Sequence, residues 1–442
     1  MPERKLLITI TPTELTSKVS NSINVRPKPM KVLVSAFAAS PVRGSEFAVG
    51  WEWIQAIAER HQVWVITRES EREEIESYLS AHPSELANVS FRYVPWNEPT
   101  NQGIFLHVVY TRRYIQWQKQ CLAAARELDA KENFNIIHHI NGTGFREPGF
   151  LWKLGKPFVW GPILGLQYFR LRFLRLIPIE EAIFLVVKNL AIAWMMRIAR
   201  RPRQAAYAAS RILAGTKQNA TMIERLWKRP SLVVSPVTPP AVRHNQPARR
   251  NQDEPLRLIW CGRIDAKKAL GLLLRALEGL NDGEVKWELL VIGSGQMEDQ
   301  CRRMAHDQGI LERCKFIGQQ TRDDTLALMQ GGHVFIHSSL YEGAPTTVVE
   351  AMSRGLPPVG MDHCGFRDAV DDSCGILIPP TNIDSVIVEF AEAIRKLWRD
   401  EESRYKMALA AQATARLLSW EHKKQIVKSI YEDIQRSDHR SN

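Results

Sequence analysis

Two segments in the second half of the chain combine residue types that bind phosphate groups and sugar hydroxyls. The first is LYEGAPTTVVEAMSRGLPPVG (340–360), which follows an apolar run. Pro345 fits the first position of a helix, so the segment predicts a helix over residues 346–354. The unpaired amides and the positive dipole end at the start of such a helix favour an anion such as phosphate.

Two glutamates accompany this predicted helix. Glu342 lies in the turn before it, and Glu350 lies one turn inside it. A carboxylate can accept hydrogen bonds from two vicinal hydroxyls, as an acidic residue does for ribose in dinucleotide sites. The alternative is a pair of solvated helix glutamates. The apolar strand before the turn and the Gly-Leu-Pro stop after the helix argue against that alternative.

The second segment is CGRIDAKKA (261–269), which follows another apolar run. After Gly262, Arg263 leaves the end of the strand, and Lys268 stands five residues further on, near the start of the next helix. An arginine fork and a lysine point charge can together neutralise a diphosphate without a metal ion. The alternative is a solvated helix start, which would be unusual because cations at a helix N-terminus oppose the dipole.

Two glycine-containing turns are further candidate binding sites. Gly44 in GSEFAVGWEW follows the first strand and would let the backbone approach a ligand, although a plain tight turn explains it equally well. Gly293 and Gly295 in VIGSGQMED follow a later strand. A G-x-G pair is a weak signal for dinucleotide binding, and Glu298 occupies the place of the third glycine in that fingerprint.

Short apolar strands that alternate with helical segments must position these residues. Most of the strands are continuously apolar, which is typical of parallel strands covered on both faces. The alternation therefore predicts an α/β protein with doubly wound parallel sheets. The predicted strands are 31–37, 63–67, 91–96, 135–140, 157–163, 211–215 and 231–237, and then 257–264, 287–295, 315–319, 333–339, 356–361 and 375–380.

The pattern is interrupted once, by a polar, proline-rich stretch, and then restarts. We therefore expect two Rossmann-like domains with a central cleft between them, at the carboxyl ends of the strands. The predicted organisation is a polar extension (1–29), an N-terminal Rossmann-like domain (30–237), a linker (238–256), a C-terminal Rossmann-like domain (257–418) and a C-terminal helix (419–442).

The two motifs together resemble glycosyltransferase family 4, the retaining glycosyltransferases of GT-B fold. The resemblance rests on Gly-Arg-Ile-x-x-x-Lys and, some eighty residues later, a Glu-x7-Glu turn and helix, and it extends over nearly the whole chain from Met30. One departure is Ala269, where the family usually has glycine. Another is Cys364-Gly365-Phe366-Arg367-Asp368, where many members have Gly-Gly-x-x-Glu, so the donor sugar stays open.

The resemblance implies a role for each motif residue. Arg263 and Lys268 would hold the diphosphate of a nucleotide-sugar donor, Glu350 would bind the ribose, and Glu342 would contact the donor sugar. The turn before the helix would cap the sugar and phosphate with its amides; it consists of Gly343, Ala344, Pro345 and Thr346. The resemblance also implies that the N-terminal domain holds the acceptor, that the C-terminal domain binds the nucleotide-sugar, and that the C-terminal helix crosses back to the N-terminal domain.

A histidine pair ends one of the predicted strands. In the resembled family, a histidine at this place contacts the 6-hydroxyl of the donor sugar, so His138 and His139 are both candidates. A strand histidine is more often a satisfied core residue, and because side chains alternate along a strand, only one of the two can face inward. We favour His139 for the site.

The expected reaction is transfer of a sugar to a hydroxyl acceptor with retention of configuration. The resemblance implies attack from the same face, with the leaving diphosphate taking the acceptor proton. We expect no cofactor and no metal, since cations and backbone amides meet the developing charge. The alternatives are a nucleotide-sugar epimerase of the same fold, an NAD-dependent oxidoreductase that uses Gly293 and Gly295, and a non-catalytic binding protein.

The composition narrows the class of protein and the compartment. The chain has 442 residues, 24% of them charged and 45% hydrophobic, which excludes disordered, collagen-like and disulfide-stapled proteins. The six cysteines form no CxxC pair, so we expect a reducing, cytoplasmic setting without structural zinc. The first thirty or so residues contain no apolar core of a secretory signal, and no stretch is apolar for the roughly 18 residues that a membrane span needs.

The net charge of +11 favours polyanionic partners. No helix-turn-helix, zinc-finger or RNP-type pattern supports nucleic acid as the partner. Over half of the excess charge lies within residues 164–203, where arginines are interleaved with leucine and phenylalanine. This region predicts contact with an anionic membrane surface on the inner face of the cell membrane, with packing inside the protein as an equal alternative.

Overall fold

The computed structural model describes residues 28–44, 46–98, 106–140, 144–240, 246–251, 253–281 and 283–439. The predicted polar extension (1–29) lies almost entirely outside these residues. The chain divides into two compact units. Unit 1 comprises Met1–Leu166, Trp194–Pro236 and Trp420–Asn442, and unit 2 comprises Gln167–Ala193 and Val237–Ser419.

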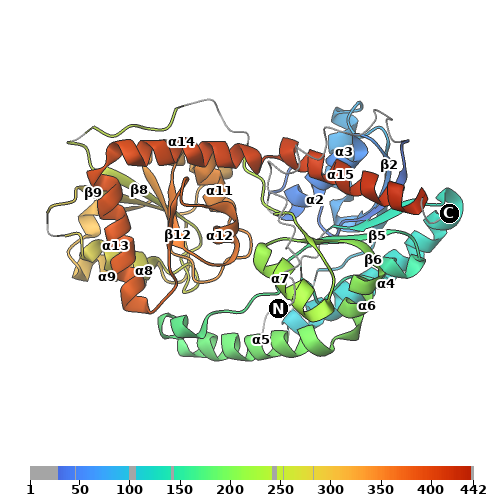
Figure 1. The fold of residues 1–442 in the computed structure, drawn as a ribbon, viewed down its shortest axis with the longest axis horizontal. Coiled ribbons are helices and arrows are strands. Elements are labelled where there is room, and N and C mark those ends of the chain that lie inside the picture. The colour runs from blue at the N-terminus through green and yellow to red at the C-terminus, as the bar shows by residue number, and fades with distance from the viewer. Residues whose placement is uncertain are drawn as a thin grey trace, which may run out of the picture. The chain divides into compact units, whose positions relative to one another are not determined.

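Unit 1 contains a seven-stranded sheet within the described residues, in the order β3-β2-β1-β4-β5-β6-β7 (Figure 1). Every neighbouring pair in this order is parallel. The strands are β1 (Lys31–Ser35), β2 (Gln62–Arg68), β3 (Val89–Val94), β4 (Ile136–His139), β5 (Phe158–Ile163), β6 (Ala209–Ala214) and β7 (Leu232–Val233). The helices are α2 (Glu46–Ala58), η1 (Glu69–Glu71), α3 (Arg72–Ala81), α4 (Leu106–Glu132), η2 (Leu151–Leu154), α6 (Arg200–Ala208), α7 (Lys217–Trp227) and α15 (Trp420–His439).

Unit 2 contains a six-stranded parallel sheet within its described residues, in the order β10-β9-β8-β11-β12-β13. The strands are β8 (Leu256–Cys261), β9 (Trp287–Ile292), β10 (Cys314–Phe316), β11 (Val334–His337), β12 (Pro358–Met361) and β13 (Ile376–Ile378). The helices are η3 (Leu171–Leu176), α8 (Leu270–Glu278), α9 (Glu298–Asp307), η4 (Leu311–Arg313), α10 (Arg322–Gln330), α11 (Thr346–Ser353), α12 (Cys364–Ala369), α13 (Ile383–Arg399) and α14 (Glu401–Leu417). Helix α5 (Ile179–Ile198) begins in unit 2 and ends in unit 1.

The apolar strands form the centre of each unit because helices cover both faces of the sheet. In β8, Leu258 and Trp260 belong to one buried cluster with residues of α8 and α13, whereas Ile259 belongs to another with residues of α11 and α14. Successive side chains of a strand point to opposite faces, so the two clusters mark the two covered faces. The prediction that these apolar strands are covered on both faces is confirmed.

The C-terminal helix completes the core of unit 1. Val427, Ile430, Tyr431 and Ile434 of α15 are buried together with Val32 and Val34 of β1 and Trp53 of α2. Figure 1 shows α15, in red, running beside α2. The C-terminal helix, which was predicted to be separate from the C-terminal domain, thus packs with residues of the N-terminal one.

Two stretches group differently from the predicted boundaries. Residues Gln167–Ala193 fell inside the predicted N-terminal domain, yet they group with unit 2. Part of the predicted linker also packs on unit 2, because the buried Arg250 donates from Nη2 to the carbonyl of Trp398 at 2.6 Å. The linker was predicted because the stretch is proline-rich and polar, but its Arg250 packs as part of unit 2.

Candidate functional site

The predicted phosphate-binding residues follow the carboxyl ends of adjacent strands in unit 2. Gly262 and Arg263 follow β8, Gly293 follows β9, and Glu342 lies in the loop after β11. In the sheet, β8 has β9 on one side and β11 on the other. The parallel sheet therefore brings the two motifs together at one edge, where α/β proteins bind ligands.

Glycines allow the loops after β8 and β9 to pack backbone against backbone. Gly293 has a φ of +130°, and a Cβ there would lie 1.9 Å from the carbonyl oxygen of Gly262. A Cβ on Gly295 would lie 2.3 Å from the carbonyl oxygen of Ile264. The amide of Gly293 donates to the carbonyl of Gly318 at 2.8 Å. In this structure Gly293 allows its loop to pack against the loop that carries Arg263, and its contact with the donor stays a prediction.

An aspartate that the motif analysis missed organises the cation loop. One carboxylate oxygen of Asp265 accepts from Nε of Arg263 at 2.7 Å, and the other accepts from the amide of Lys268 at 2.9 Å. The Arg263 side chain is 72% exposed, so its remaining guanidinium hydrogens stay accessible. Ala269 follows with a φ of +48°, a conformation that costs a residue with a Cβ about 1–2 kcal/mol and accounts for the usual glycine.

Lys268 and Glu342 form an ion pair between their side chains. Both side chains are largely buried, at 26% and 20% exposure. The two residues are separated by 74 positions in the chain and come from the two different motifs. The ion pair therefore joins the predicted diphosphate-binding lysine to the predicted sugar-binding glutamate.

The turn after Glu342 presents backbone amides. Helix α11 begins at Thr346, and Pro345 is the capping residue before it, one position earlier than predicted. The amide of Thr346 donates to the carbonyl of Ala344 at 2.9 Å, so this predicted ligand amide is used inside the turn. Within the described residues, the amides of Gly343 and Ala344 make no hydrogen bond. These two are the amides of the predicted set that remain for an anion.

A second contact involves the segment that departs from the resembled family. The amide of Gly365, in the Cys-Gly-Phe-Arg-Asp segment, donates to the carbonyl of Glu342 at 3.0 Å. A Cβ on Gly365 would lie 2.6 Å from the carbonyl oxygen of Gly343. The segment therefore supports the turn through its glycine.

Glu350 is buried and has an arginine partner. It is 6% exposed, and Oε1 accepts from Nε of Arg322 at 2.9 Å. Burial raises the pKa of Glu350, while Arg322 opposes the shift. Burial, with the charge of Glu350 added, raises the pKa of Cys261 to about 12, and the charge of Lys268 opposes it. The end of β8 thus lies near both motif residues, and Arg322 of α10 is a site residue that sequence spacing could not identify.

Two buried histidines at the same edge also escaped the motif analysis. His337 ends β11, stacks on Phe366 with ring centroids 5.4 Å apart, and has no partner for Nε2. Burial, aided by the charges of Lys268 and His363, lowers the pKa of His337 well below its usual value. Burial and the charge of Arg170 lower the pKa of His363 to about 4, against a backbone hydrogen bond at Ser339. Both pKa shifts favour the neutral imidazole.

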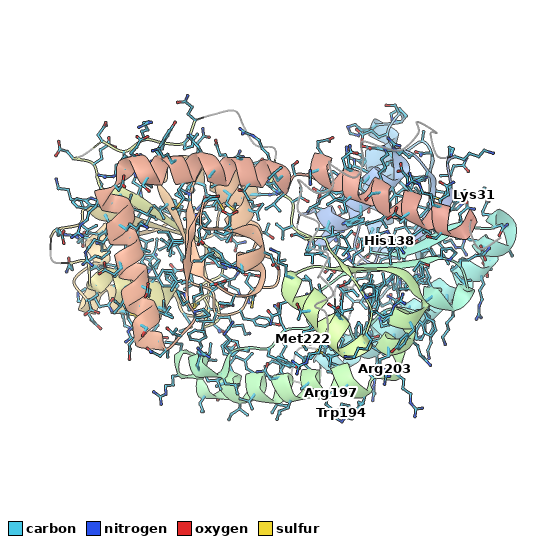
Figure 2. The ribbon with its side chains drawn as sticks, viewed as in Figure 1. Lys31, His138, Trp194, Arg197, Arg203 and Met222 are labelled. Carbon is cyan, nitrogen blue, oxygen red and sulfur yellow. The ribbon has the colours of Figure 1, made fainter. Side chains whose placement is uncertain are left out.

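The predicted histidines of unit 1 have different environments. His138 is fully buried, with Nδ1 2.8 Å from the hydroxyl of Tyr431 and Nε2 3.0 Å from the carbonyl oxygen of Gly161. Both ring nitrogens are used inside unit 1, which leaves none for a donor. Burial lowers the pKa of His139 to about 4; the Glu147 backbone lies close enough to oppose this shift, yet neither ring nitrogen makes a hydrogen bond of ordinary geometry. Figure 2 labels His138 between the sheet and α15.

Gly44 and a cavity lie elsewhere in unit 1. Gly44 is exposed, and a Cβ there would meet nothing within 4 Å. The cavity has a volume of about 520 Å³ and combines aromatic, acidic and basic side chains. Its lining includes Tyr110, Tyr114, Arg146, Glu147, Arg200 and Arg201. No local sequence pattern predicts this cavity, because its walls come from the loop after β1, from α2 and α4, from the loop after β4 and from the junction of α5 and α6.

The described residues contain neither a candidate metal site nor a single helix that could span a membrane. No group of three or more His, Cys, Asp or Glu side chains there could hold a metal ion. No single described helix is long and apolar enough to cross a membrane, and the pair α5 and α6 passes that test only jointly, with a bend of 51°.

The sequence comparisons identify the second half of the chain. Residues 242–414 match the family model of the glycosyl transferases group 1. The chain is 29% identical over 168 residues to the amylovoran biosynthesis glycosyltransferase AmsK of Erwinia amylovora, covering 36% of this chain and 40% of that protein. It is 29% identical over 180 residues to the phosphatidyl-myo-inositol mannosyltransferase of Mycobacterium leprae, covering 40% and 46%. These alignments span less than half of each relative.

Solved structures extend the likeness to most of the chain. Sucrose-phosphate synthase from Thermosynechococcus elongatus aligns with a TM-score of 0.62 at 15% identity, covering 92% of this chain and all of that one. Anabaena HepE in complex with UDP and glucose aligns with a TM-score of 0.56 at 16% identity, covering 91% and 100%. At this identity the likeness concerns the fold, and it agrees with the predicted GT-B architecture. Residues 242–414 thus match the group 1 glycosyltransferases in sequence, and the two parallel-sheet units of the chain have the GT-B fold.

Proposed function

We propose that the protein transfers a sugar from a nucleotide-diphospho-sugar to a hydroxyl acceptor, with retention of configuration and without a metal ion. The observation that carries the proposal is the Lys268–Glu342 ion pair beside the unpaired amides of Gly343 and Ala344. A cation, a carboxylate and backbone donors meet there at the carboxyl edge of the unit 2 sheet. The solved complexes of HepE with UDP and with UDP-glucose support a donor of this class.

The site residues would act mainly through electrostatics. Arg263 and Lys268 would bind the diphosphate and stabilise the charge that grows on it as the sugar leaves. The N-terminal end of α11 would add its dipole to the same charge. Glu342 would orient the sugar hydroxyls, and Glu350 would accept hydrogen bonds from the ribose.

The acceptor would bind in unit 1. Its cavity of about 520 Å³ has the size of a small-ligand site, and its aromatic and charged lining suits a sugar or a phosphate-bearing group. His139, whose ring nitrogens make no hydrogen bond of ordinary geometry with the described residues, remains a proposed contact of the donor sugar. We place the enzyme on the cytoplasmic face of the cell membrane, with a polysaccharide, glycolipid or lipid carrier as the acceptor.

The first test is a thermal-shift screen with UDP, GDP, ADP and NAD, each with EDTA and then with magnesium. A ligand at 100 times its dissociation constant stabilises a protein by about 2.7 kcal/mol. We expect one nucleoside diphosphate to raise the melting temperature equally with EDTA and with magnesium. A shift with NAD alone would instead favour the oxidoreductase. Water-dependent conversion of the nucleotide-sugar without any added acceptor would favour the epimerase.

The second test removes the proposed ribose contact. Glu350→Ala should weaken binding of the nucleotide by about 1.5–3 kcal/mol, because the ribose hydroxyls lose a charged acceptor. The control is Glu389→Ala, which removes an exposed glutamate from the middle of α13, outside the loops of the candidate site. Binding measured by calorimetry should fall for the first variant and not for the second. Equal affinity in both would remove Glu350 from the site.

A further inference from the structure

Helix α5 exposes a continuous apolar stripe. Seven large apolar residues on it are between 48% and 74% exposed. Apart from one adjacent pair, they recur every three or four positions, which places them on one side of a helix. They are Ile179, Ile183, Phe184, Val187, Leu190, Trp194 and Ile198.

The opposite side of α5 is fixed to the protein. Leu185, Ile192 and Met196 are each less than 5% exposed. The amide group of Asn189 makes two hydrogen bonds to the backbone of Phe169, at 2.9 and 2.8 Å. The helix is therefore apolar on both sides, and packing within the protein accounts for only one of them. Because its inner side is buried, α5 cannot leave the protein to cross a bilayer as a free helix.

The structure narrows the region that the sequence indicated for membrane contact. Within residues 164–178, Phe169 and Phe173 are buried in the core of unit 2. Arg172 donates from Nη1 to the carbonyl of Pro380 at 2.7 Å. This part of the region packs internally, and the apolar surface that remains exposed belongs chiefly to α5.

Exposed cations lie at both ends of the stripe. Before α5, the exposed cations include Arg170 and Arg175, and at its end and beyond, they include Arg197, Arg200 and Arg203. Of the two glutamates in the first turn of α5, Glu181 is paired with Lys267 at 2.5 Å. Figure 2 shows Trp194 and Arg197 on the side of α5 that faces away from the strands of unit 1. An apolar face with a tryptophan and flanking arginines is the pattern of a helix in an anionic bilayer interface.

From these observations we infer that the exposed face of α5 docks on an anionic lipid bilayer, with the helix in the plane of the membrane. Apolar side chains enter the boundary between headgroups and acyl chains, and the arginines bind lipid phosphates. The arginines attract an anionic bilayer. A second copy of the chain would instead place the same arginines against one another, and they would repel.

Docking also assigns a class of acceptor, and this step rests on the proposed function. Met195, Ala199 and Arg200, at the end of α5 and the start of α6, line the unit 1 cavity. A docked α5 therefore holds the cavity beside the headgroups. The acceptor that fits is a lipid-linked hydroxyl compound in the same leaflet, with its phosphate near Arg146 and Arg200.

Co-sedimentation of the full chain with vesicles tests the docking. Phosphatidylcholine vesicles, with and without phosphatidylglycerol, serve as the probe. We expect binding that requires phosphatidylglycerol and that Phe184→Ser/Leu190→Ser abolishes. The matched control is Val388→Ser/Leu409→Ser, which removes apolar residues of 59% and 44% exposure from α13 and α14. The control should sediment like the wild type.

A charge series tests the lipid specificity. Arg175→Gln/Arg203→Gln should lower the partition coefficient about thirtyfold, because each arginine contributes separately near an anionic surface. The control Arg416→Gln, on an exposed position of α14, should leave it unchanged.

Three outcomes would overturn the docking: no binding of the wild type to phosphatidylglycerol vesicles, equal binding of the stripe variant and its control, or a wild-type dimer that the stripe variant converts to monomers. The thermal shift with nucleoside diphosphate, measured on the same variants, keeps the two proposals distinguishable. If the stripe variant loses vesicle binding but keeps the thermal shift with nucleoside diphosphate, docking and donor binding are separate properties. If neither the wild type nor any variant shows the thermal shift, that result counts against the donor site and not against the docking.

Discussion

At the residue scale, the charged groups of the candidate site are held by partners far away in the chain. Glu350 is paired with Arg322 across 28 positions, and Lys268 with Glu342 across 74. Motif spacing identified the members that would touch the donor, since their types suit phosphate and hydroxyl groups. It could not identify Arg322 or Asp265, because nothing in the local sequence says which side chains the fold brings beside them.

A buried lysine on α15 gives a pH-dependent prediction. Lys423 is 4% exposed, and burial lowers its pKa to about 7, with Glu52 opposing the shift. Between this pKa and the ordinary value of 10.5, the unfolded chain binds a proton that the folded chain does not. The free energy of unfolding therefore rises with pH across that window, by about 1.4 kcal/mol per pH unit from this group.

Lys423→Met should remove this slope and raise the melting temperature at pH 7. The control is Lys424→Met at the neighbouring position, where a hydrogen bond to Glu59 raises the lysine pKa. Chemical unfolding between pH 7 and pH 10 measures the difference. If Lys423→Met keeps the wild-type slope, the lysine is charged in the folded protein.

At the element scale, the strands were the most predictable part of the fold. A parallel strand covered on both faces is largely apolar, so strands such as β1 and β5 stand out in the sequence. The predicted strand 231–237 is reduced to Leu232–Val233, and the helix predicted from Pro345 begins at Thr346. The start at Thr346 agrees with the predicted helix 346–354, whereas its end at Ser353 is one residue short and Pro345 precedes the helix instead of opening it. Ends of elements depend on contacts that local sequence does not encode.

The packing of the two loops depends on glycine, which gives an element-scale prediction. Gly293→Ala places a Cβ 1.9 Å from the Gly262 carbonyl oxygen at a φ of +130°. The loops must separate, so we expect a loss of about 2–4 kcal/mol in stability and weaker nucleotide binding. The control is Gly331→Ala in the same unit, where the nearest atom would be 3.7 Å away. If Gly293→Ala binds the nucleotide as tightly as the wild type does, the packing of the two loops is not needed for donor binding.

At the scale of the whole molecule, chain order and spatial grouping differ. The sequence indicated two sheets and a C-terminal helix separate from the second one. It did not indicate that Gln167–Ala193 group with unit 2, because their apolar residues suit either unit equally. Which unit buries Phe169 and Phe173 is decided by tertiary packing, and no local signal records it.

Removal of α15 tests how far unit 1 depends on it. A chain that ends at Ser419 lacks Val427, Ile430 and Tyr431, which cover Val32 and Val34. Amides of β1 and β4 should then exchange with deuterium faster, while those of β8 and β11 keep their protection. The milder variant Tyr431→Phe removes one hydrogen bond to His138 and should cost about 1–3 kcal/mol. Equal protection of β1 in the full and the shortened chain would show that α15 is dispensable.

The return of α15 also sets an order of events during translation. The first strand of unit 1 leaves the ribosome early, whereas the helix that covers it follows all of unit 2. The nascent chain must therefore hold an uncovered apolar sheet face while the second unit is synthesised and folds. A ribosome stalled before Trp420 would leave that face exposed to chaperones and proteases, so unit 1 is covered only after α15 has been synthesised.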